Sequence, residues 1–359
     1  MKPACGDLIL ALKTPRVMAA FSPAQWDRVI PHARAAGLLG RLGALAVQHS
    51  LAAGLPKPVW FALEAGLAFS ERQAVAVRRE LGKLDTALAA LGIPVLVLKG
   101  AAYVATGSPA AAGRLMTDID ILVPKQAIGE TEAALMLAGW VSSHHDAYDQ
   151  RYYRQWMHEI PPMQHIRRGT VLDVHHNLLP ETARIQTRPD LILANARPLP
   201  GMACLHAPSE LDLILHSATH LMHEGEWDHG LRDLSDLYAM LAAGAGQADD
   251  FWPSLAKRAQ TLSLQRPLYL ALVQLHRVFG LDAPALDLPQ AQRYGDRVIH
   301  GLLTRALSGF HSSCRLPLAP LASFALFARS HWLRMPAHLL IPHLLYKALK
   351  RENAAKTEG

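Results

Sequence analysis

Two short stretches near residue 100 decide the fold: Pro94-Val-Leu-Val-Leu-Lys-Gly100 and Asp118-Ile-Asp-Ile-Leu-Val-Pro124. Each contains an apolar run bounded by proline or glycine, which is typical of a buried strand. A third run, Val171-Leu-Asp-Val-His175, again places a single acid among apolar residues. The three runs predict a small sheet in which charged side chains stand on or beside buried strands.

The residues between these runs complete a compact unit. Ala101–Thr106 predicts a helical turn, and Thr131–Gly139 predicts a helix that ends at its glycine. Gln155–Met163 and Thr170–His175 alternate around a turn at Arg168-Gly169, which predicts an antiparallel hairpin. Strand, helix, strand, helix and paired strands describe a small α/β unit.

The flanking regions have helical patterns. Apolar residues recur with a helical period from Glu71 to Leu91, and Gly92 ends that helix. Ser209 is a suitable N-cap for a helix that begins the C-terminal region. Further helices are expected over Leu231–Leu241, Leu255–Leu264 and Pro267–Phe279, with a flexible link at Ala242–Ala248. We therefore divide the chain into helical residues 1–92, an α/β core at 93–205, and helical residues 206–359 with a basic tail.

Composition excludes several classes of protein. The chain has 359 residues, of which 50% are hydrophobic and 18% charged, so it is not an intrinsically disordered protein. Three widely spaced cysteines argue against a disulfide framework or a cysteine zinc site. The N-terminus lacks the apolar core of a signal peptide, and no apolar stretch approaches the about 20 residues of a membrane span. We expect a cytoplasmic protein.

Three carboxylates predict a metal centre. Asp118 and Asp120 are two apart and project from the same face of their strand, and Asp173 is the only acid of its strand. Such carboxylates cannot all stay ionised side by side without a cation. Mg²⁺ takes oxygen ligands and bridges phosphates, with Mn²⁺ as a substitute. Two ions about 4 Å apart would clamp the attacking and leaving oxygens at phosphorus.

Basic and glycine residues beside these acids suit a triphosphate. The turn at Lys99-Gly100 would let backbone N–H groups reach the phosphates, and Arg114 would neutralise developing charge. A purely structural interpretation makes Asp118 and Asp120 strand-end capping residues and Asp173 a surface residue. Lys99 is equally well explained as a solvated residue at a strand end.

The sequence resembles the nucleotidyltransferase-fold family of polymerase β-like proteins in the order of its motifs. These are LKG, a gap, R-x-M-x-DIDILV, and then an acid-x-His in a strand. The nearest branch is a poorly characterised bacterial group. The resemblance extends through SELDLILHSATHLMHE and LRDLSDLYAML, so it spans roughly residues 80–245. It implies an α+β fold with a small mixed sheet, flanked by helical regions.

The resemblance also implies roles for particular residues. Gly100 would hold the triphosphate, Asp118 and Asp120 would bind metal, and Asp173 would complete the site. An acceptor hydroxyl would attack the α-phosphorus of an NTP such as ATP, and pyrophosphate would leave. Lys99-Gly100-Ala101 departs from the Gly-Ser or Gly-Gly of many relatives, and the gap to Asp118 is long.

The chain contains 19 histidines, but none has an HExxH or paired Cys/His zinc spacing. His175 shares a strand face with Asp173 and would contact substrate or orient that acid, with simple packing as the alternative. His216, His220 and His223 share one helix face, for which a partly exposed polar face is the simpler interpretation. In the alternative, that face is a wall of the active site and His220 contacts substrate. Arg232 and Asp236 match the pattern of the resembled family without an assigned chemistry, and an i,i+4 salt bridge between them is an equally good expectation.

Other functions remain open. A catalytically weak module of the same fold would serve as a binding or regulatory partner. Residues 297–359 hold nine lysines and arginines against two glutamates, a net charge of +7. This basic segment, which is rich in apolar residues, suits the inner surface of an anionic membrane or RNA, with a solvated helix face as the alternative. The acceptor is a small molecule, a protein or RNA.

Overall fold

The computed structural model describes residues 3–142, 146–223, 225–246, 248–307, 311–312, 314–344 and 346. The chain begins with helices, apart from short 3-10 turns: α1 (Pro3–Lys13), α2 (Pro23–Ala35), α3 (Leu39–Gln48) and α4 (Lys57–Leu88). Strands and helices then alternate: β1 (Val95–Leu98), α5 (Lys99–Thr106), β2 (Ile119–Leu122), α6 (Ile128–Leu137), β3 (Trp140–Ser142), α7 (Ala147–Trp156), β4 (Met163–His165), β5 (Val171–His175), α8 (Pro189–Ala194), β6 (Arg197–Pro198) and β7 (Leu205–Ala207). The remaining described elements are helices: α9 (Glu210–His223), α10 (Gly230–Ala245), α11 (Phe251–Thr261), α12 (Gln265–Phe279), α13 (Asp296–Leu307) and α14 (Ala319–Arg334).

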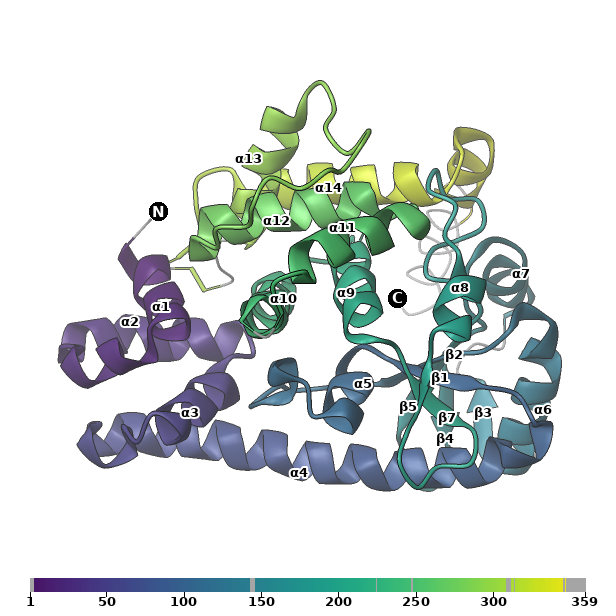
Figure 1. Cartoon of the computed structure of the whole chain (residues 1–359), viewed down its shortest axis with the longest axis horizontal. Helices are drawn as coiled ribbons and strands as arrows, with labels where there is room; N and C mark the ends of the chain where they lie inside the picture. Colours follow the sequence, from purple (N-terminus) through teal and green to yellow (C-terminus); the bar gives the residue numbers. More distant parts are fainter. Residues whose placement is uncertain are drawn as a thin grey trace, which may run out of the picture.

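A single mixed sheet forms the centre of the α/β region. Its strand order is β3-β4-β5-β2-β1-β7-β6, with β2 antiparallel to β1 and parallel to β5. Figure 1 shows α4 along one side of the molecule and α11, α12 and α14 along the opposite side. This arrangement confirms the predicted α+β class with flanking helices.

The predicted helix before β1 is confirmed and is longer than expected. α4 runs from Lys57 to Leu88, and the chain leaves it through Gly92 at φ +63°. Its buried Leu81, Leu84 and Leu88 face the core. The Asp85 carboxylate accepts hydrogen bonds from three successive backbone N–H groups just before and within β7, so α4 is anchored to the start of that strand.

Two predicted boundaries were wrong. Residues 155 and 156 end α7, and the hairpin strand begins only at Met163, because Pro161 and Pro162 have no N–H to donate to a strand ladder. The expected link at 242–248 is helical through Ala245, since alanine favours a helix. The division at residue 205 stays a prediction, and β7 crosses it to pair with β1.

Three glycines bring the loop before β2 against the N-terminal helices. Gly113 has φ +67°, and a Cβ there would lie 2.2 Å from the backbone carbon of Gly40 in α3. A Cβ on Gly40 would in turn meet the carbonyl oxygen of Gly66 in α4 at 2.8 Å. The long gap between Gly100 and Asp118 is therefore a loop docked on α3 and α4.

A buried ion-pair cluster fastens the same loop to the C-terminal helices. Asp236 of α10 lies with one carboxylate oxygen 2.6 Å from Arg41 Nη2 and the other 2.6 Å from Arg114 Nε. Arg41 also donates to the carbonyl oxygen of Ala110 and to the hydroxyl of Ser235. The expected Arg232–Asp236 salt bridge was wrong, because Arg232 pairs with Asp233 and the two buried arginines already bind Asp236.

The basic C-terminal segment is partly packed and partly exposed. α14 buries Ala322, Leu326 and Ser330, while Leu321 and Phe324 point outward. Within the described ranges, none of the helices has both the length and the apolar character that a bilayer crossing requires.

We predict that Gly113→Ala destabilises the protein more than Gly107→Ala does. Both glycines have φ +67°, so alanine strains the backbone equally at either position, by about 1 kcal/mol. Only at Gly113 does the new methyl meet backbone atoms, and such overpacking costs about 1–3 kcal/mol more. Urea unfolding of the two variants measures the difference, and equal losses would contradict the close contact.

Candidate active site

The pairing of β2 brings the predicted carboxylates together. Asp120 lies opposite Asp173 in the parallel β2–β5 pair, and Leu98, which precedes Lys99, lies opposite Asp120 on the other side. Asp118 precedes Asp120 by two residues, so both project toward the same face of the sheet. One face therefore presents all three acids.

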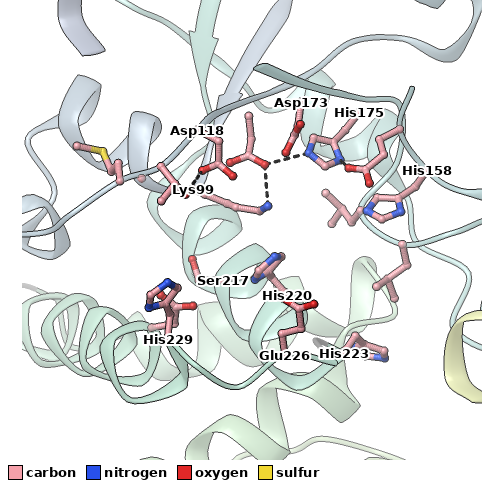
Figure 2. A pocket seen from close by; sticks show the side chains of 18 of the residues that line it. Lys99, Asp118, His158, Asp173, His175, Ser217, His220, His223, Glu226 and His229 are labelled. Carbon is pink, nitrogen blue, oxygen red and sulfur yellow. Dashed lines mark hydrogen bonds and ion pairs between the residues drawn. The ribbon is translucent and has the colours of Figure 1, made fainter. Parts of the chain in front are cut away.

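These acids line a cavity of about 410 Å³. Figure 2 shows Lys99, Asp118, Asp173 and His175 on one wall and His220 on the facing wall. The facing wall comes from α9 and from the residues that connect it to α10, which include Glu226 and His229. The cavity thus lies between the sheet and the C-terminal helices.

Asp120 is the buried centre of the first wall. Its Oδ1 atom accepts from Lys99 Nζ at 2.7 Å and from His175 Nε2 at 3.0 Å. Burial alone would raise the pKa of Asp120, but the Lys99 ammonium and His175 hold it well below its ordinary value. Burial alone would lower the pKa of Lys99, and the attraction of Asp120 raises it above the ordinary value instead. Both groups are therefore charged at neutral pH.

Asp173 is in the opposite situation. Its Oδ1 atom is buried and has no hydrogen-bond partner among the described residues. Burial first, and then the charges of Asp120 and Glu159, raise the pKa of Asp173 to about 7. Burial and Asp120 likewise raise the pKa of Asp118. An unsatisfied buried carboxylate oxygen beside two other acids fits a divalent cation with oxygen ligands.

The predicted triphosphate residues lie on the cavity wall. Lys99 has φ +46°, an uncommon conformation for a residue with a side chain, and α5 begins there. A Cβ on Gly100 would lie 2.6 Å from Arg114 Nη1 and 2.7 Å from Met116 Cγ, so any other residue would require these side chains to shift. Their contact with phosphate stays a prediction.

Arg114 also lines the cavity, with a guanidinium that already has partners. It binds Asp236 as described above, and its Nη2 atom lies 3.3 Å from Asp233 Oδ1. Burial alone would lower its pKa, and these two carboxylates raise it above its ordinary value. Its predicted role toward a nucleotide stays a prediction, and the structure gives it a role in holding the loop.

Two of the three histidines on this face of α9 are buried, since His216 and His223 are 4% and 3% accessible, and the expectation of a partly exposed face was wrong for them. His220 is partly exposed, as that interpretation expects. His220 and His223 line the cavity, which is the alternative expectation. Burial lowers the pKa of His220 well below its ordinary value and that of His223 to about 3, so both rings are neutral.

His175 contacts an acid of the row, but that acid is Asp120 rather than the expected Asp173. Its Nε2 atom faces Asp120, and its Nδ1 atom lies 3.2 Å from Glu159 Oε2. Burial alone would lower the pKa of His175, but the Asp120 hydrogen bond and the Glu159 charge raise it. Sequence reasoning assigned no role to Glu159 or to Arg334, which also lines the cavity. The adjacent pair Pro161-Pro162 was the available signal that Glu159 lies outside a regular strand.

The raised pKa of Asp173 predicts a pH-dependent stability. The folded protein retains this proton up to about pH 7, whereas an unperturbed aspartate loses it near 3.8. The free energy of unfolding should therefore fall as pH rises through this window, and Asp173→Asn should escape that loss.

In metal-free buffer we expect Asp173→Asn to exceed the wild type in stability at pH 8, by on the order of 2–4 kcal/mol. The difference should shrink toward pH 4. Denaturant unfolding across this range measures it, and a difference that is independent of pH would contradict the crowding of the three acids.

Comparison with known proteins agrees with this geometry. The family model described as "Uncharacterised nucleotidyltransferase" matches residues 22–280, which include β1, β2, β5 and the helices α9 and α10. Searches of curated proteins and of solved structures give no match. Because the family model covers well over half of the chain, the protein belongs to this family of uncharacterised nucleotidyltransferases.

Proposed function

We propose that this protein is a metal-dependent nucleotidyltransferase that moves an NMP from an NTP to a hydroxyl of an acceptor. The observation that carries the proposal is the row formed by Asp118, Asp120 and Asp173 on one sheet face, open to the cavity. The cavity volume of about 410 Å³ lies within the range of small-molecule sites, which supports a nucleotide as occupant.

The three carboxylates would hold two Mg²⁺ ions, for which Mn²⁺ could substitute. When bound, the ions would stabilise negative charge on the attacking and leaving oxygens. Asp120 is already ionised because of Lys99 and His175. Asp118 and Asp173 have raised pKa values that a nearby cation would lower.

Residues of the chain would accept the proton of the acceptor hydroxyl and would neutralise the negative charge of the phosphates. The acceptor oxygen forms a bond to the α-phosphorus, the bond to the pyrophosphate oxygen breaks, and the hydroxyl proton passes to a base. Asp173 is our candidate for that base, because it lines the cavity in the same row as the carboxylates that would hold the ions. Lys99 and the first backbone N–H groups of α5 at Gly100 would face the phosphates.

The alternative is a protein of the same fold with weak turnover that binds a nucleotide or a partner. The buried, unsatisfied oxygen of Asp173 favours the enzyme, since a module without catalysis gains nothing from three crowded acids. The acceptor, whether a small molecule, a protein or RNA, is chosen by residues outside this row.

We predict that one of ATP, CTP, GTP and UTP stabilises the protein in a Mg²⁺-dependent way. A ligand at about 100 times its Kd that binds only the folded state contributes about 2.7 kcal/mol, which a thermal-shift assay detects. Asp118→Asn should abolish the shift. Asp118 is the better position than Asp120, because Asp120→Asn would leave the buried Lys99 ammonium without its counter-ion.

The matched control is Asp190→Asn, which removes an exposed carboxylate on α8 outside the cavity. This variant should keep the full nucleotide shift. A shift that persists in Asp118→Asn would show that the nucleotide binds elsewhere, and the absence of a shift with any NTP would favour the binding module.

We also propose that the outer face of α14 contacts an anionic membrane surface. Leu321 and Phe324 are exposed, and the chain has no acidic residue between Arg297 and Arg351. Exposed apolar side chains together with basic charge are what binds a protein to anionic lipid.

We expect the wild type to partition onto vesicles that contain anionic lipid, and the double variant Leu321→Glu/Phe324→Glu to stay in solution. Phe61→Glu is the control, because Phe61 is 73% exposed on the distant α4. Co-sedimentation measures both. Equal partitioning of the two variants would contradict the assignment of this face.

A further inference from the structure

A second cluster of ligand-type side chains lies beside the carboxylate row. Glu159 and His175 form an isolated antiparallel β-bridge through their backbones. Further along the same two segments, Met163 of β4 pairs with Leu172 of β5. Met163 lies four residues after Glu159, whereas their partners Leu172 and His175 are only three residues apart. The first segment therefore has one extra residue, which forms a bulge at the two prolines. The bulge places Glu159 beside the His175 ring.

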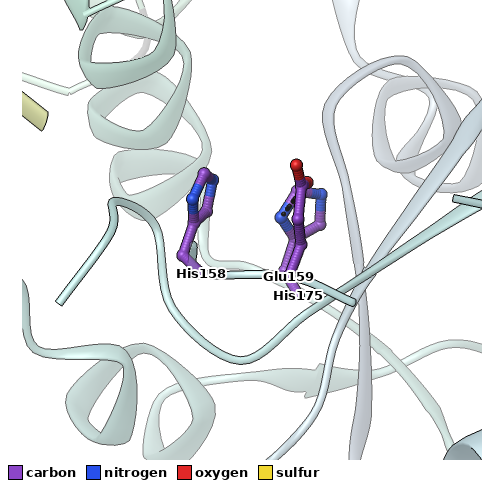
Figure 3. A group of neighbouring side chains, drawn as sticks. All are labelled: His158, Glu159 and His175. Atoms are coloured by element: carbon purple, nitrogen blue, oxygen red, sulfur yellow. Dashed lines mark ion pairs between the residues drawn. The ribbon is translucent and has the colours of Figure 1, made fainter. Parts of the chain in front are cut away.

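His158 completes the cluster. Its carbonyl oxygen accepts from the backbone N–H of His176, which fixes the chain at this point. Its ring lies 5.2 Å from the His175 ring, centroid to centroid, and its buried Nδ1 atom has no hydrogen-bond partner among the described residues. Figure 3 shows the His158 ring standing beside the Glu159–His175 pair.

The three side chains are arranged as metal ligands. One potential ligand atom from each of His158, Glu159 and His175 lies within 4.8 Å of the other two, which is close enough for one ion between them. All three residues line the cavity, so the coordination positions that they leave empty face its interior.

Asp120 provides the supporting interaction that metal-bound histidines commonly have. Its ionised carboxylate can only accept, so His175 Nε2 donates the hydrogen bond between them. The other ring nitrogen, Nδ1, is then directed toward Glu159 at 3.2 Å. A carboxylate that fixes the far nitrogen of a ligating histidine orients the ring for a metal ion.

We propose that His158, Glu159 and His175 bind a first-row transition-metal dication of the Zn²⁺ class, at a site separate from the Mg²⁺ position at Asp118, Asp120 and Asp173. Two imidazole nitrogens and one carboxylate suit such ions, whereas Mg²⁺ prefers oxygen ligands. The remaining positions of the ion would take water or an oxygen of the acceptor. The proposal concerns metal binding and holds whether or not the protein transfers nucleotides.

The test uses the full chain after removal of metals with a chelator. Cobalt(II) is the probe, because it replaces Zn²⁺ and gives a visible absorption spectrum in a low-coordinate site. We expect one equivalent to bind with such a spectrum, to remain bound in excess Mg²⁺, and to be displaced by Zn²⁺. His158→Gln and Glu159→Gln should each weaken cobalt binding by about 10-fold or more.

Two control variants keep the result specific. His229→Gln removes a histidine from the same cavity outside the cluster, and it should leave cobalt affinity unchanged. Asp118→Asn should lose the Mg²⁺-dependent nucleotide shift and keep the cobalt site, which separates a failure of the proposed function from a failure of this proposal. Thermal unfolding of each metal-free variant checks the fold.

Three outcomes would overturn the proposal. Cobalt that binds without a visible spectrum, or that millimolar Mg²⁺ displaces, would indicate ordinary carboxylate binding. Equal affinity in the wild type and both cluster variants would place the ion elsewhere. A loss in His229→Gln as large as that in His158→Gln would mean that the cavity histidines bind cobalt without a defined site.

Discussion

The architecture depends on one buried carboxylate. Asp236 lies almost fully buried in α10 and is bound by Arg41 from α3 and Arg114 from the loop before β2. An unpaired charge in this environment costs several kcal/mol, so the three segments hold together or the cluster fails as a unit. Through Arg114 the same cluster positions the chain that leads into Asp118 and Asp120. Strand β2 is thus held from outside the sheet by α3, which precedes the sheet in sequence, and by α10, which follows it.

The same physics produces an asymmetry within the site. Asp236 and Asp120 each have permanent cations nearby, whereas the buried oxygen of Asp173 has no hydrogen-bond partner among the described residues. The paired acids are fixed parts of the structure. The raised pKa of Asp173 follows from its burial beside the carboxylates of Asp120 and Glu159. The charges around each aspartate therefore distinguish Asp236 and Asp120, which have cationic partners, from Asp173, whose buried oxygen has no hydrogen-bond partner among the described residues.

Local signals predicted much of this fold. The apolar runs of β1, β2 and β5, the capped start of α9 and the glycine after α4 follow from burial and backbone preference, and the two-residue spacing of Asp118 and Asp120 predicted their shared face. The approach of Arg41 to Asp236 joins residues nearly two hundred positions apart, and no local pattern encodes it. The position of Glu159 depends on a one-residue bulge, which a regular strand pattern cannot show. The burial of His216 and His223 was missed because the later helices α10, α11, α12 and α14 pack against α9, which the pattern of α9 alone does not show.

α14 contributes both to an exposed apolar surface and to the wall of the polar cavity. Its outer face carries Leu321 and Phe324, while Arg334 at its C-terminal end lines the cavity that also contains Lys99. A partner that shifts this helix also reshapes the cavity wall. Thermodynamic reciprocity then requires that a ligand in the cavity change the affinity for that partner by the same factor. Under the proposed membrane contact, binding at the outer face of α14 and binding in the cavity would then influence each other through this helix.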